Sequence, residues 1–175
     1  MALLRGINVG RNKRVAMADL RALLEGLGYT EVRTLLQSGN AVFASTARKP
    51  EKVAADIEAA IVAQLGLTVS VIVRTGKELH QVVDGHPFAD LADNGSRMMV
   101  HFLSAAPDPE LLRAHDPTVV DPDHARLGPK VVYQWCPDGI LEAPDVICPI
   151  MTLLGLTVTT RNWNTVEKLA AMVDA

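Results

Sequence analysis

The order in which strand-like and helix-like patterns follow one another constrains the fold of this sequence more than any other feature. A short apolar segment at residues 2–9 precedes leucines at helical spacing. Two apolar runs at residues 32–37 and 41–45 enclose a Ser-Gly-Asn segment that favours a tight hairpin turn. A helix starting at Pro50 and an alternating strand at residues 68–73 complete a β-α-β-β-α-β order. This order is that of the ferredoxin-like fold.

The rest of the chain repeats this order after a connecting helix. Thr75 and Glu78 have the spacing of a capping box at the start of that helix. The further elements are expected to be a strand at 98–104, a short helix after Pro109, a hairpin over 127–136, a helix ending at Gly155 and a strand over 157–160. A final helix is predicted to begin with Asn164 as its N-cap.

We therefore expect an α+β protein made of duplicated ferredoxin-like (βαββαβ) halves with antiparallel sheets. Residues 1–75 form the first half, and residues 76–175 hold the connector helix, the second half and the C-terminal helix. A chain of this length can form two small domains, or the two halves can share the core of one compact domain.

The composition excludes several classes of protein. Hydrophobic residues make up 49% and charged residues 21% of the chain, so long disordered segments are not expected. No run approaches the roughly 20 apolar residues that a membrane span needs. Arg5 and Asn8 also interrupt the first apolar segment, where a signal peptide would be continuous. These patterns predict cytoplasmic residence without membrane association.

The cysteines and histidines do not form the pattern of a metal site. Cys136 and Cys148 match no common zinc spacing and are expected to be reduced thiols. The histidines are scattered, and His101, within an apolar strand, is expected to be a hydrogen-bonded sheet residue rather than a base. Since the sequence also lacks a nucleophile motif and an obvious carboxylate pair, no metal or cofactor is predicted and an enzymatic role stays open.

Charge is distributed unevenly along the chain. The formal net charge is −3 and the pI is about 5.9, so bulk electrostatics do not favour binding to a nucleic-acid backbone. The segment before Asp19 nevertheless contains Arg5, Arg11, Lys13 and Arg14 and no acidic residue. This local excess of positive charge predicts a site for an anion near the amino terminus.

The loop after the first strand is the first candidate site. Its candidate ligand-binding residues are Arg5, Asn8, Asn12 and Lys13, and they precede a helix whose free amides attract anions. Guanidinium and ammonium groups form charge-assisted hydrogen bonds with phosphate or carboxylate. The spacing matches neither a P-loop nor the glycine pattern of dinucleotide-binding folds. The alternative is a solvated basic loop whose asparagines only form turns.

The predicted hairpin provides the second candidate. Gln37, Ser38 and Asn40 can donate and accept hydrogen bonds, so they suit ligand recognition better than acid-base chemistry. The alternative is that Ser38 and Asn40 serve the turn, as Asn and Gly commonly do. A turn does not require Gln37.

The third candidate lies just before the last helix. Arg161, Asn162 and Asn164 surround Trp163, and such a group of side chains could clamp a planar or anionic ligand. The alternative assigns Asn164 to the helix cap, Trp163 to packing and Arg161 to a surface ion pair.

Three stretches of the sequence together resemble a known family. They are residues 3–10 (LLRGINVG), 37–43 (QSGNAVF) and 160–168 (TRNWNTVEK). They resemble the bacterial proteins grouped as domain of unknown function 1697, and the HPF of residues 86–88 also falls in the expected order. The resemblance implies a duplicated ferredoxin-like fold and implies no activity. Family members often follow a DGI segment with a basic GRSKL-like one, whereas residues 138–145 read DGILEAPD.

Three functions of different classes remain open. The first is a binding module for a small anionic ligand, such as a nucleotide or a phosphorylated metabolite. The second is an enzyme that positions a phosphoryl or acyl group electrostatically, and the third is a protein or nucleic-acid interaction partner that uses the N-terminal basic loop. Sheet-face RNA binding is not expected, because Asn40, Val42 and Ser45 occupy the positions of the stacking aromatic residues.

Overall fold

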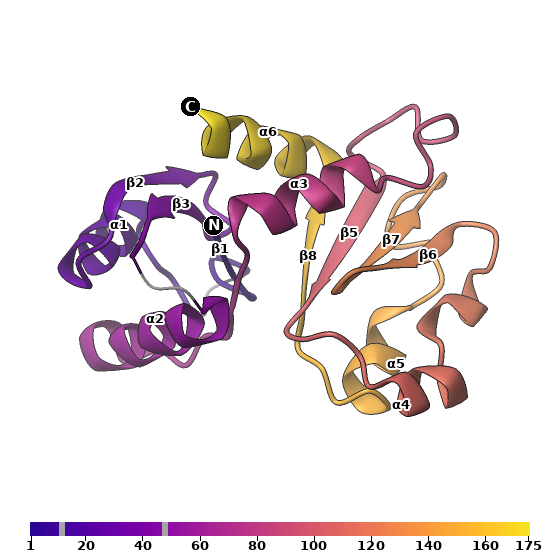
Figure 1. Cartoon of the computed structure of the whole chain (residues 1–175), viewed down its shortest axis with the longest axis horizontal. Helices are drawn as coiled ribbons and strands as arrows, with labels where there is room; N and C mark the ends of the chain where they lie inside the picture. Colours follow the sequence, from indigo (N-terminus) through magenta and orange to yellow (C-terminus); the bar gives the residue numbers. More distant parts are fainter. Residues whose placement is uncertain (11–12, 47–48) are drawn as a thin grey trace. The chain divides into compact units, whose positions relative to one another are not determined.

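The computed structural model describes residues 1–10, 13–46 and 49–175. The chain is a mixed α+β protein that divides into two compact units (Figure 1). The first unit comprises Met1–Leu79 with Leu169–Ala175, and the second comprises His80–Lys168. Each unit contains one four-stranded antiparallel sheet with helices, which confirms the expected fold class at this level.

The first unit arranges its strands in the order β2-β3-β1-β4, and every neighbouring pair is antiparallel. Its elements are β1 (Ala2–Leu4), α1 (Met17–Gly26), β2 (Thr30–Leu35), β3 (Asn40–Ala44), α2 (Pro50–Leu65) and β4 (Val71–Val73). One face of the sheet and the two helices form a single apolar cluster that includes Leu4, Leu24 and Ile57. The helices pack there because their apolar residues recur at helical spacing.

Local sequence sets the ends of α2 as predicted. Pro50 is the first helical residue, where its missing N–H costs no hydrogen bond. Gly66 ends the helix in the left-handed conformation, with φ of 64°, and its N–H donates to the Val62 carbonyl.

The first strand is shorter than predicted, because it ends at Leu4 and not near residue 9. Gly6 and Asn8 have positive φ angles, which turn the chain away from the sheet. The hairpin turn also differs, because it occupies residues 36–39 and Asn40 is already the first residue of β3. Asn40 closes this turn by donating its side-chain N–H to the Leu35 carbonyl at 2.8 Å.

The predicted capping box is present at the start of α3 (Gly76–Asp84). The Thr75 N–H donates to Glu78 Oε2 at 2.9 Å, and the Glu78 N–H donates to Thr75 Oγ1 at 3.1 Å. The boundary between the two units falls within this helix, after Leu79.

The second unit arranges its strands in the order β6-β7-β5-β8, again with antiparallel neighbours. Its elements are β5 (Met98–Leu103), α4 (Pro109–Ala114), the 3-10 helix η1 (Pro117–Val120), β6 (Ala125–Gly128), β7 (Val131–Trp135), α5 (Ile147–Thr152) and β8 (Val158–Asn162). All residues of β5 and β7 are buried, so these two central strands are covered on both faces. Figure 1 shows α4 and α5 on one of these faces.

The last helix, α6 (Trp163–Asp174), begins earlier than predicted. Asn162, not Asn164, caps it, because Asn162 Oδ1 accepts hydrogen bonds from the Thr165 N–H at 3.0 Å and from the Thr165 hydroxyl at 2.8 Å. The cap lies two residues earlier than predicted because β8 continues to Asn162, which leaves no loop between the strand and the helix.

Two other predictions concern thiols and membrane helices. Cys136 is buried and Cys148 is exposed, and both are free thiols. Within the described ranges, the longest helix is α2, and no helix combines the length and apolar character of a membrane span.

Candidate functional site

Asn8 connects the basic loop to the hairpin turn in the first unit. Its side-chain N–H group donates to the Val15 carbonyl at 2.9 Å and to the Gln37 carbonyl at 2.6 Å. Its Oδ1 accepts from the Val15 N–H at 2.9 Å, and its own N–H donates to the Lys13 carbonyl at 3.1 Å. Asn8 therefore closes the loop on itself and ties it to the turn. We call residues 5–10 and 13–15 with the turn 36–39 the loop pair.

Gly39 brings the turn close to the end of β1. Its φ is +79°, and a Cβ there would lie 2.7 Å from both Ile7 Cδ1 and Leu4 Cβ. The Leu4 N–H donates to the Gly39 carbonyl at 2.8 Å. Only glycine fits this close approach without displacement, so the turn sequence itself positions the loop pair.

The predicted residues of the loop pair divide into structural and exposed groups. The side chains of Asn8 and the fully buried Asn40 form hydrogen bonds with the backbone, and Asn40 Nδ2 also donates to Ser38 Oγ at 3.0 Å. Lys13, Gln37 and Ser38 are exposed, whereas Arg5 is half-buried. Asn12, like Arg11, lies outside the described residues. The structure thus brings the first two candidate segments together at one end of the first sheet.

The third candidate segment belongs to the second unit. Arg161 is buried, and its Nη1 donates to Thr159 Oγ1 at 3.0 Å and to the Thr160 carbonyl at 2.7 Å. Burial lowers the pKa of this guanidinium to about 10. The alternative expected Arg161 at the surface, and this position is wrong, because the side chain is buried.

Asn164 and Trp163 pack against the segment that precedes β5. A Cβ on Gly95 would lie 2.2 Å from Asn164 Oδ1, so glycine is needed at this contact. The Trp163 and His86 rings lie 4.1 Å apart between centroids. His86 Nδ1 accepts a hydrogen bond from the Phe88 N–H at 3.1 Å, and burial lowers the pKa of His86. The HPF and TRNWN segments therefore form one packed cluster, which supports a structural role for Trp163.

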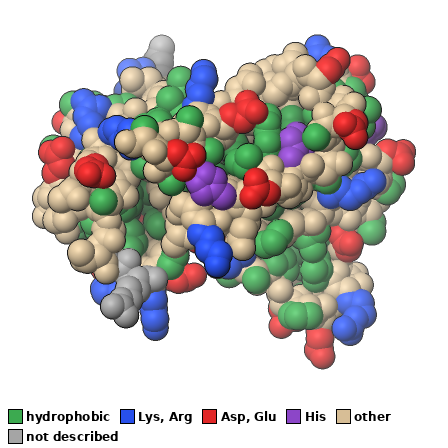
Figure 2. Space-filling view, turned by 45° about the horizontal axis from the view of Figure 1, so that its top comes forward, with side chains coloured by type: hydrophobic (Ala, Val, Ile, Leu, Met, Phe, Trp, Pro, Cys, Tyr) green, Lys and Arg blue, Asp and Glu red, His purple; other side chains and the backbone are tan. Residues whose placement is uncertain are grey.

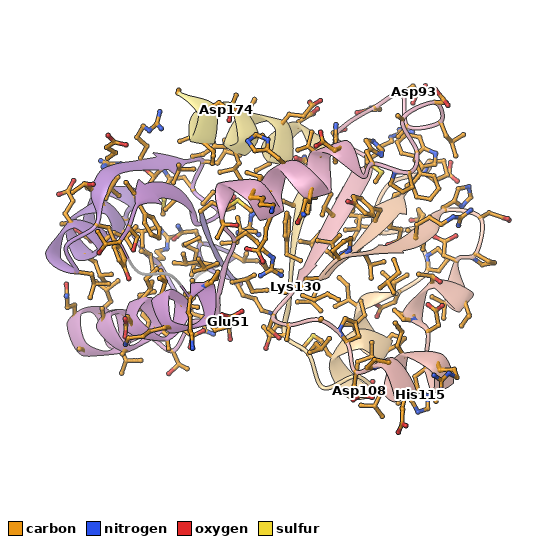
Figure 3. The ribbon with its side chains drawn as sticks, viewed as in Figure 1. Glu51, Asp93, Asp108, His115, Lys130 and Asp174 are labelled. Carbon is orange, nitrogen blue, oxygen red and sulfur yellow. The ribbon has the colours of Figure 1, made fainter. Side chains whose placement is uncertain are left out.

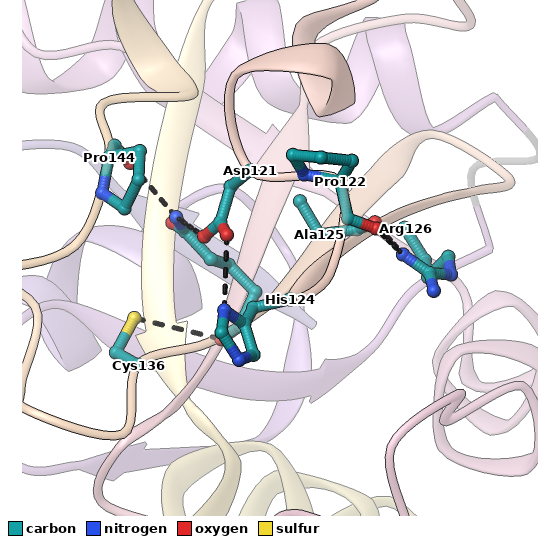
Figure 4. A network of polar contacts seen from close by, with 8 residues as sticks. Asp121, Pro122, His124, Ala125, Arg126, Cys136 and Pro144 are labelled. Carbon is teal, nitrogen blue, oxygen red and sulfur yellow. Dashed lines mark hydrogen bonds and ion pairs between the residues drawn. The ribbon is translucent and has the colours of Figure 1, made fainter.

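Hydrogen-bonded polar side chains form a line across strands β8, β5 and β7 of the second sheet, and most of this line was not predicted from the sequence. Figure 4 shows the end of the line at Asp121. Gln134 Nε2 donates to Asp121 Oδ2 and to the Pro144 carbonyl, both at 2.9 Å. Because these oxygens only accept, Gln134 Oε1 faces His101 Nε2, at 3.1 Å. Nε2 therefore carries the proton, and Nδ1 accepts from the Thr160 hydroxyl at 2.8 Å.

His101 is a neutral structural residue in this line. It is 1% exposed, and desolvation lowers its pKa to about 4. Both ring nitrogens are hydrogen-bonded, as expected for a satisfied sheet residue. We call Thr160, His101, Gln134 and Asp121 the polar line.

The polar line ends at a histidine near the surface. His124 Nδ1 lies 3.2 Å from Asp121 Oδ1, and the side chains are 36% and 7% exposed. The segment DPDH that carries this pair was not predicted as a site, since an Asp-x-x-His spacing in a loop has no specific meaning by itself. The hydrogen bond from the buried Gln134 side chain is what shows that the Asp121 carboxylate is held in place.

Comparison with known proteins supports the fold and leaves the activity open. The family model described as "Protein of unknown function (DUF1697)" matches residues 1–133. Among curated proteins, none matches this sequence. A solved structure of a conserved bacterial protein from Streptococcus pneumoniae is similar, with a TM-score of 0.66 and 22% sequence identity, over 98% of this chain and 96% of that chain. At this identity the similarity concerns the fold alone.

Proposed function

Because the chain belongs to the DUF1697 family of proteins of unknown function, as its sequence predicted, we propose a function from its own residues: it binds a small anionic ligand at the loop pair. The ligand class is a nucleotide or a phosphorylated metabolite, met in the cytoplasm. The single observation that carries this proposal is the Asn8 side chain, which ties the basic loop to the hairpin turn. Without this tie the two polar segments would be independent surface loops.

The exposed side chains of the loop pair supply suitable donors for an anion. Lys13 and Arg14 are exposed, and neither side chain has a hydrogen bond or ion-pair partner among the described residues. The amide of Gln37 and the hydroxyl of Ser38 stand on the adjoining turn. An ammonium and a guanidinium beside neutral donors suit a phosphate, because charge-assisted hydrogen bonds are stronger than neutral ones.

The charge of the rest of the surface favours binding of a small anion at the loop pair over long-range attraction of a polyanion. On the face that Figure 2 shows, basic and acidic side chains are interspersed. The net charge of −3 also gives no long-range attraction for polyanions. A nucleic-acid partner would therefore have to depend on the few cations of the loop pair, and such binding would fall steeply with salt.

The fold forms part of the proposal. Each unit follows a strand-helix-strand-strand-helix-strand order with the same antiparallel neighbour pattern. We take this as support for duplicated ferredoxin-like halves, residues 1–75 and 76–175. Under this reading Arg161, Asn162 and Asn164 serve the packing of the second half, and the ligand-binding residues are those of the first.

The test measures ligand-induced thermal stabilisation with inorganic phosphate, adenosine monophosphate, glucose 6-phosphate and a short oligonucleotide at two salt concentrations. A ligand at 100 times its Kd adds about 2.7 kcal/mol, which raises the midpoint by roughly 2 to 4 °C per kcal/mol. Lys13→Ala and Arg5→Ala should abolish the shift. Lys77→Ala, an exposed lysine on α3, is the charge-matched control and should keep it.

Each outcome separates the candidate functions. A shift from a phosphorylated small molecule that survives moderate salt supports the proposal. A shift from the oligonucleotide alone, lost at high salt, would instead favour a nucleic-acid partner. Turnover of a bound phosphate ester that disappears in Arg5→Ala would favour the enzyme that acts by electrostatic positioning. Equal shifts in Lys13→Ala and Lys77→Ala would exclude the loop pair as the site.

A further inference from the structure

The second unit contains a cavity of about 190 Å³ next to the end of the polar line. Its wall is made by the segment around the Asp121–His124 pair, the end of β7 and the loop that follows β7. The lining residues are Asp121, His124, Trp135, Cys136, Pro137, Asp138, Gly139, Glu142, Ala143 and Pro144. Figure 4 shows Asp121, His124, Cys136 and Pro144 from close by.

Asp121 orients the His124 ring toward a defined hydrogen-bonding role. In the neutral imidazole, the carboxylate holds the proton on Nδ1, at 3.2 Å. Nε2, across the ring, then presents a lone pair, and it has no hydrogen-bond partner among the described residues. Asp121 is itself fixed by Gln134, and the His124 N–H donates to the Asp121 carbonyl at 3.2 Å. The acceptor is therefore preorganised before any ligand binds.

The charges of the cavity wall determine the sign of the charge that a ligand should carry. Asp121, Asp138 and Glu142 carry carboxylates, and none of the described residues that line the cavity is a lysine or an arginine. Arg97 contacts the wall from outside: its guanidinium donates to the carbonyl of Pro137, a lining residue, and is thereby engaged with the backbone. A ligand that carries positive charge and N–H donors would meet acceptors on several sides.

Covalent chemistry is not part of this site. Cys136 lines the cavity, but its side chain is buried. Desolvation, with a smaller contribution from the charge of Asp121, raises the pKa of the Cys136 thiol to about 11. The thiol therefore stays protonated near neutral pH and is a poor nucleophile.

The turn next to the cavity indicates what kind of group carries the cation. The turn from Gly139 to Glu142 is closed by the Glu142 N–H, which donates to the Gly139 carbonyl at 3.2 Å. Between these two lining residues, Ile140 is 42% and Leu141 is 93% exposed. A cavity of this size holds a head group rather than a whole metabolite, and the exposed apolar side chains of the adjoining turn suit an alkyl stem.

We propose that this cavity binds the ammonium or guanidinium group of a ligand with an alkyl stem, with His124 Nε2, Asp138 and Glu142 as hydrogen-bond acceptors. A free amine and the side chain of a lysine or arginine in a protein share this chemistry. The site is independent of the loop pair and takes a ligand of opposite charge.

The test follows the His124 ring signals by NMR in the full chain during titration with butylguanidinium, butylammonium and a short arginine-containing peptide. Saturable shifts with the alkyl cations would show that a free small cation binds the cavity. Shifts with the peptide but not with the alkyl cations would show that the ligand is a side chain of a protein. Tetramethylammonium, which has the charge without N–H donors, should bind at least tenfold more weakly. No saturable shift with any of the first three probes overturns the proposal.

Matched variants separate the site from general electrostatics. Glu142→Gln and Asp138→Asn each remove one exposed carboxylate and should weaken binding about tenfold, because a charge-assisted hydrogen bond is lost. Asp93→Asn removes an exposed acid elsewhere in the second unit and should leave the affinity unchanged (Figure 3). His124→Phe should abolish binding, whereas His115→Phe, at the end of α4, should not. Equal affinities in Glu142→Gln and Asp93→Asn would contradict the assignment.

Discussion

The two sheets have the same neighbour pattern but use their interiors differently. The cluster under the first sheet is apolar throughout, with Leu4, Leu24 and Ile57 at its centre. The corresponding interior of the second unit contains the polar line, in which His101 and Gln134 are almost completely buried. All five histidines and both tryptophans also lie between His80 and Lys168. The comparison teaches that one strand order tolerates either kind of core, provided that every buried polar group has a partner.

Truncation in the apolar core should give the largest effect. Leu24→Ala creates a cavity in the first unit and should lower the free energy of unfolding by about 3 kcal/mol. Because both tryptophans report on the second unit, amide hydrogen exchange of β3 is the appropriate measurement. Leu36→Ala, at a side chain that is 55% exposed, is the same substitution without the cavity and should cost less than about 0.5 kcal/mol. A similar loss in both variants would show that packing does not dominate this unit.

Acid should weaken the second unit through His101. Its pKa in the folded state is lowered to about 4 from 6.5, so the unfolded state binds more protons between these values. Stability is therefore complete above pH 6.5 and falls by up to roughly 3 kcal/mol as the pH drops toward 4. Denaturant unfolding followed by tryptophan fluorescence across this range measures the effect.

A His101→Gln variant sharpens this test. It should lose most of the pH dependence, with a small remainder from His86, whose pKa is also lowered by burial. His115→Gln, at an exposed position, should keep the full dependence of the natural sequence. An unchanged slope in His101→Gln would mean that other groups cause the acid sensitivity.

Converting the polar line to an apolar one tests whether it is interchangeable with the first core. Gln134→Leu leaves the His101 Nε2–H group and Asp121 Oδ2 without their partner. We expect a loss of about 2 kcal/mol in denaturant unfolding, because orphaned buried polar groups are costly. His101→Leu combined with Gln134→Leu should recover part of this loss. If Gln134→Leu were as stable as the natural sequence, water would have replaced the hydrogen bonds of the Gln134 amide.

The smallest effect should come from the helix cap at the end of the first unit. Thr75→Ala removes the hydroxyl that accepts from the Glu78 N–H, and should cost about 1 kcal/mol. Thr75→Ser keeps the hydroxyl and should restore the stability, as measured by thermal unfolding. A loss in Thr75→Ser equal to that in Thr75→Ala would indicate that the methyl group matters more than the cap.

Much of the fold could be predicted because its signals are local. Pro50 and Gly66 bound α2, and Thr75 with Glu78 begins α3, as expected from chain-neighbour chemistry. The predicted ends of helices and strands were wrong where contacts between distant parts of the chain determine them. The cap of α6 moved to Asn162 because strand pairing with β5 extends β8 up to the helix.

The candidate sites divide in the same way. The sequence predicted the residues of the loop pair and gave turn formation as the alternative role of Asn8, but it did not predict that the Asn8 side chain would reach the Gln37 carbonyl in the hairpin turn. It predicted that His101 would be a satisfied sheet residue, and the structure confirms this. It did not predict Asp121 and His124 as a pair, because their common partner Gln134 comes from another strand.

By itself, the sequence determined the class of fold, the family and the local excess of positive charge near the amino terminus, because periodicity, turn residues and composition are properties of neighbouring residues. Only the tertiary structure decided which polar side chains are exposed and which are buried. Arg161 and Asn40 read as ligand-binding residues in the sequence, yet both are buried and hydrogen-bonded within the protein. The reason is that burial and hydrogen-bond partners depend on segments far apart in the chain, which only the strand register brings together.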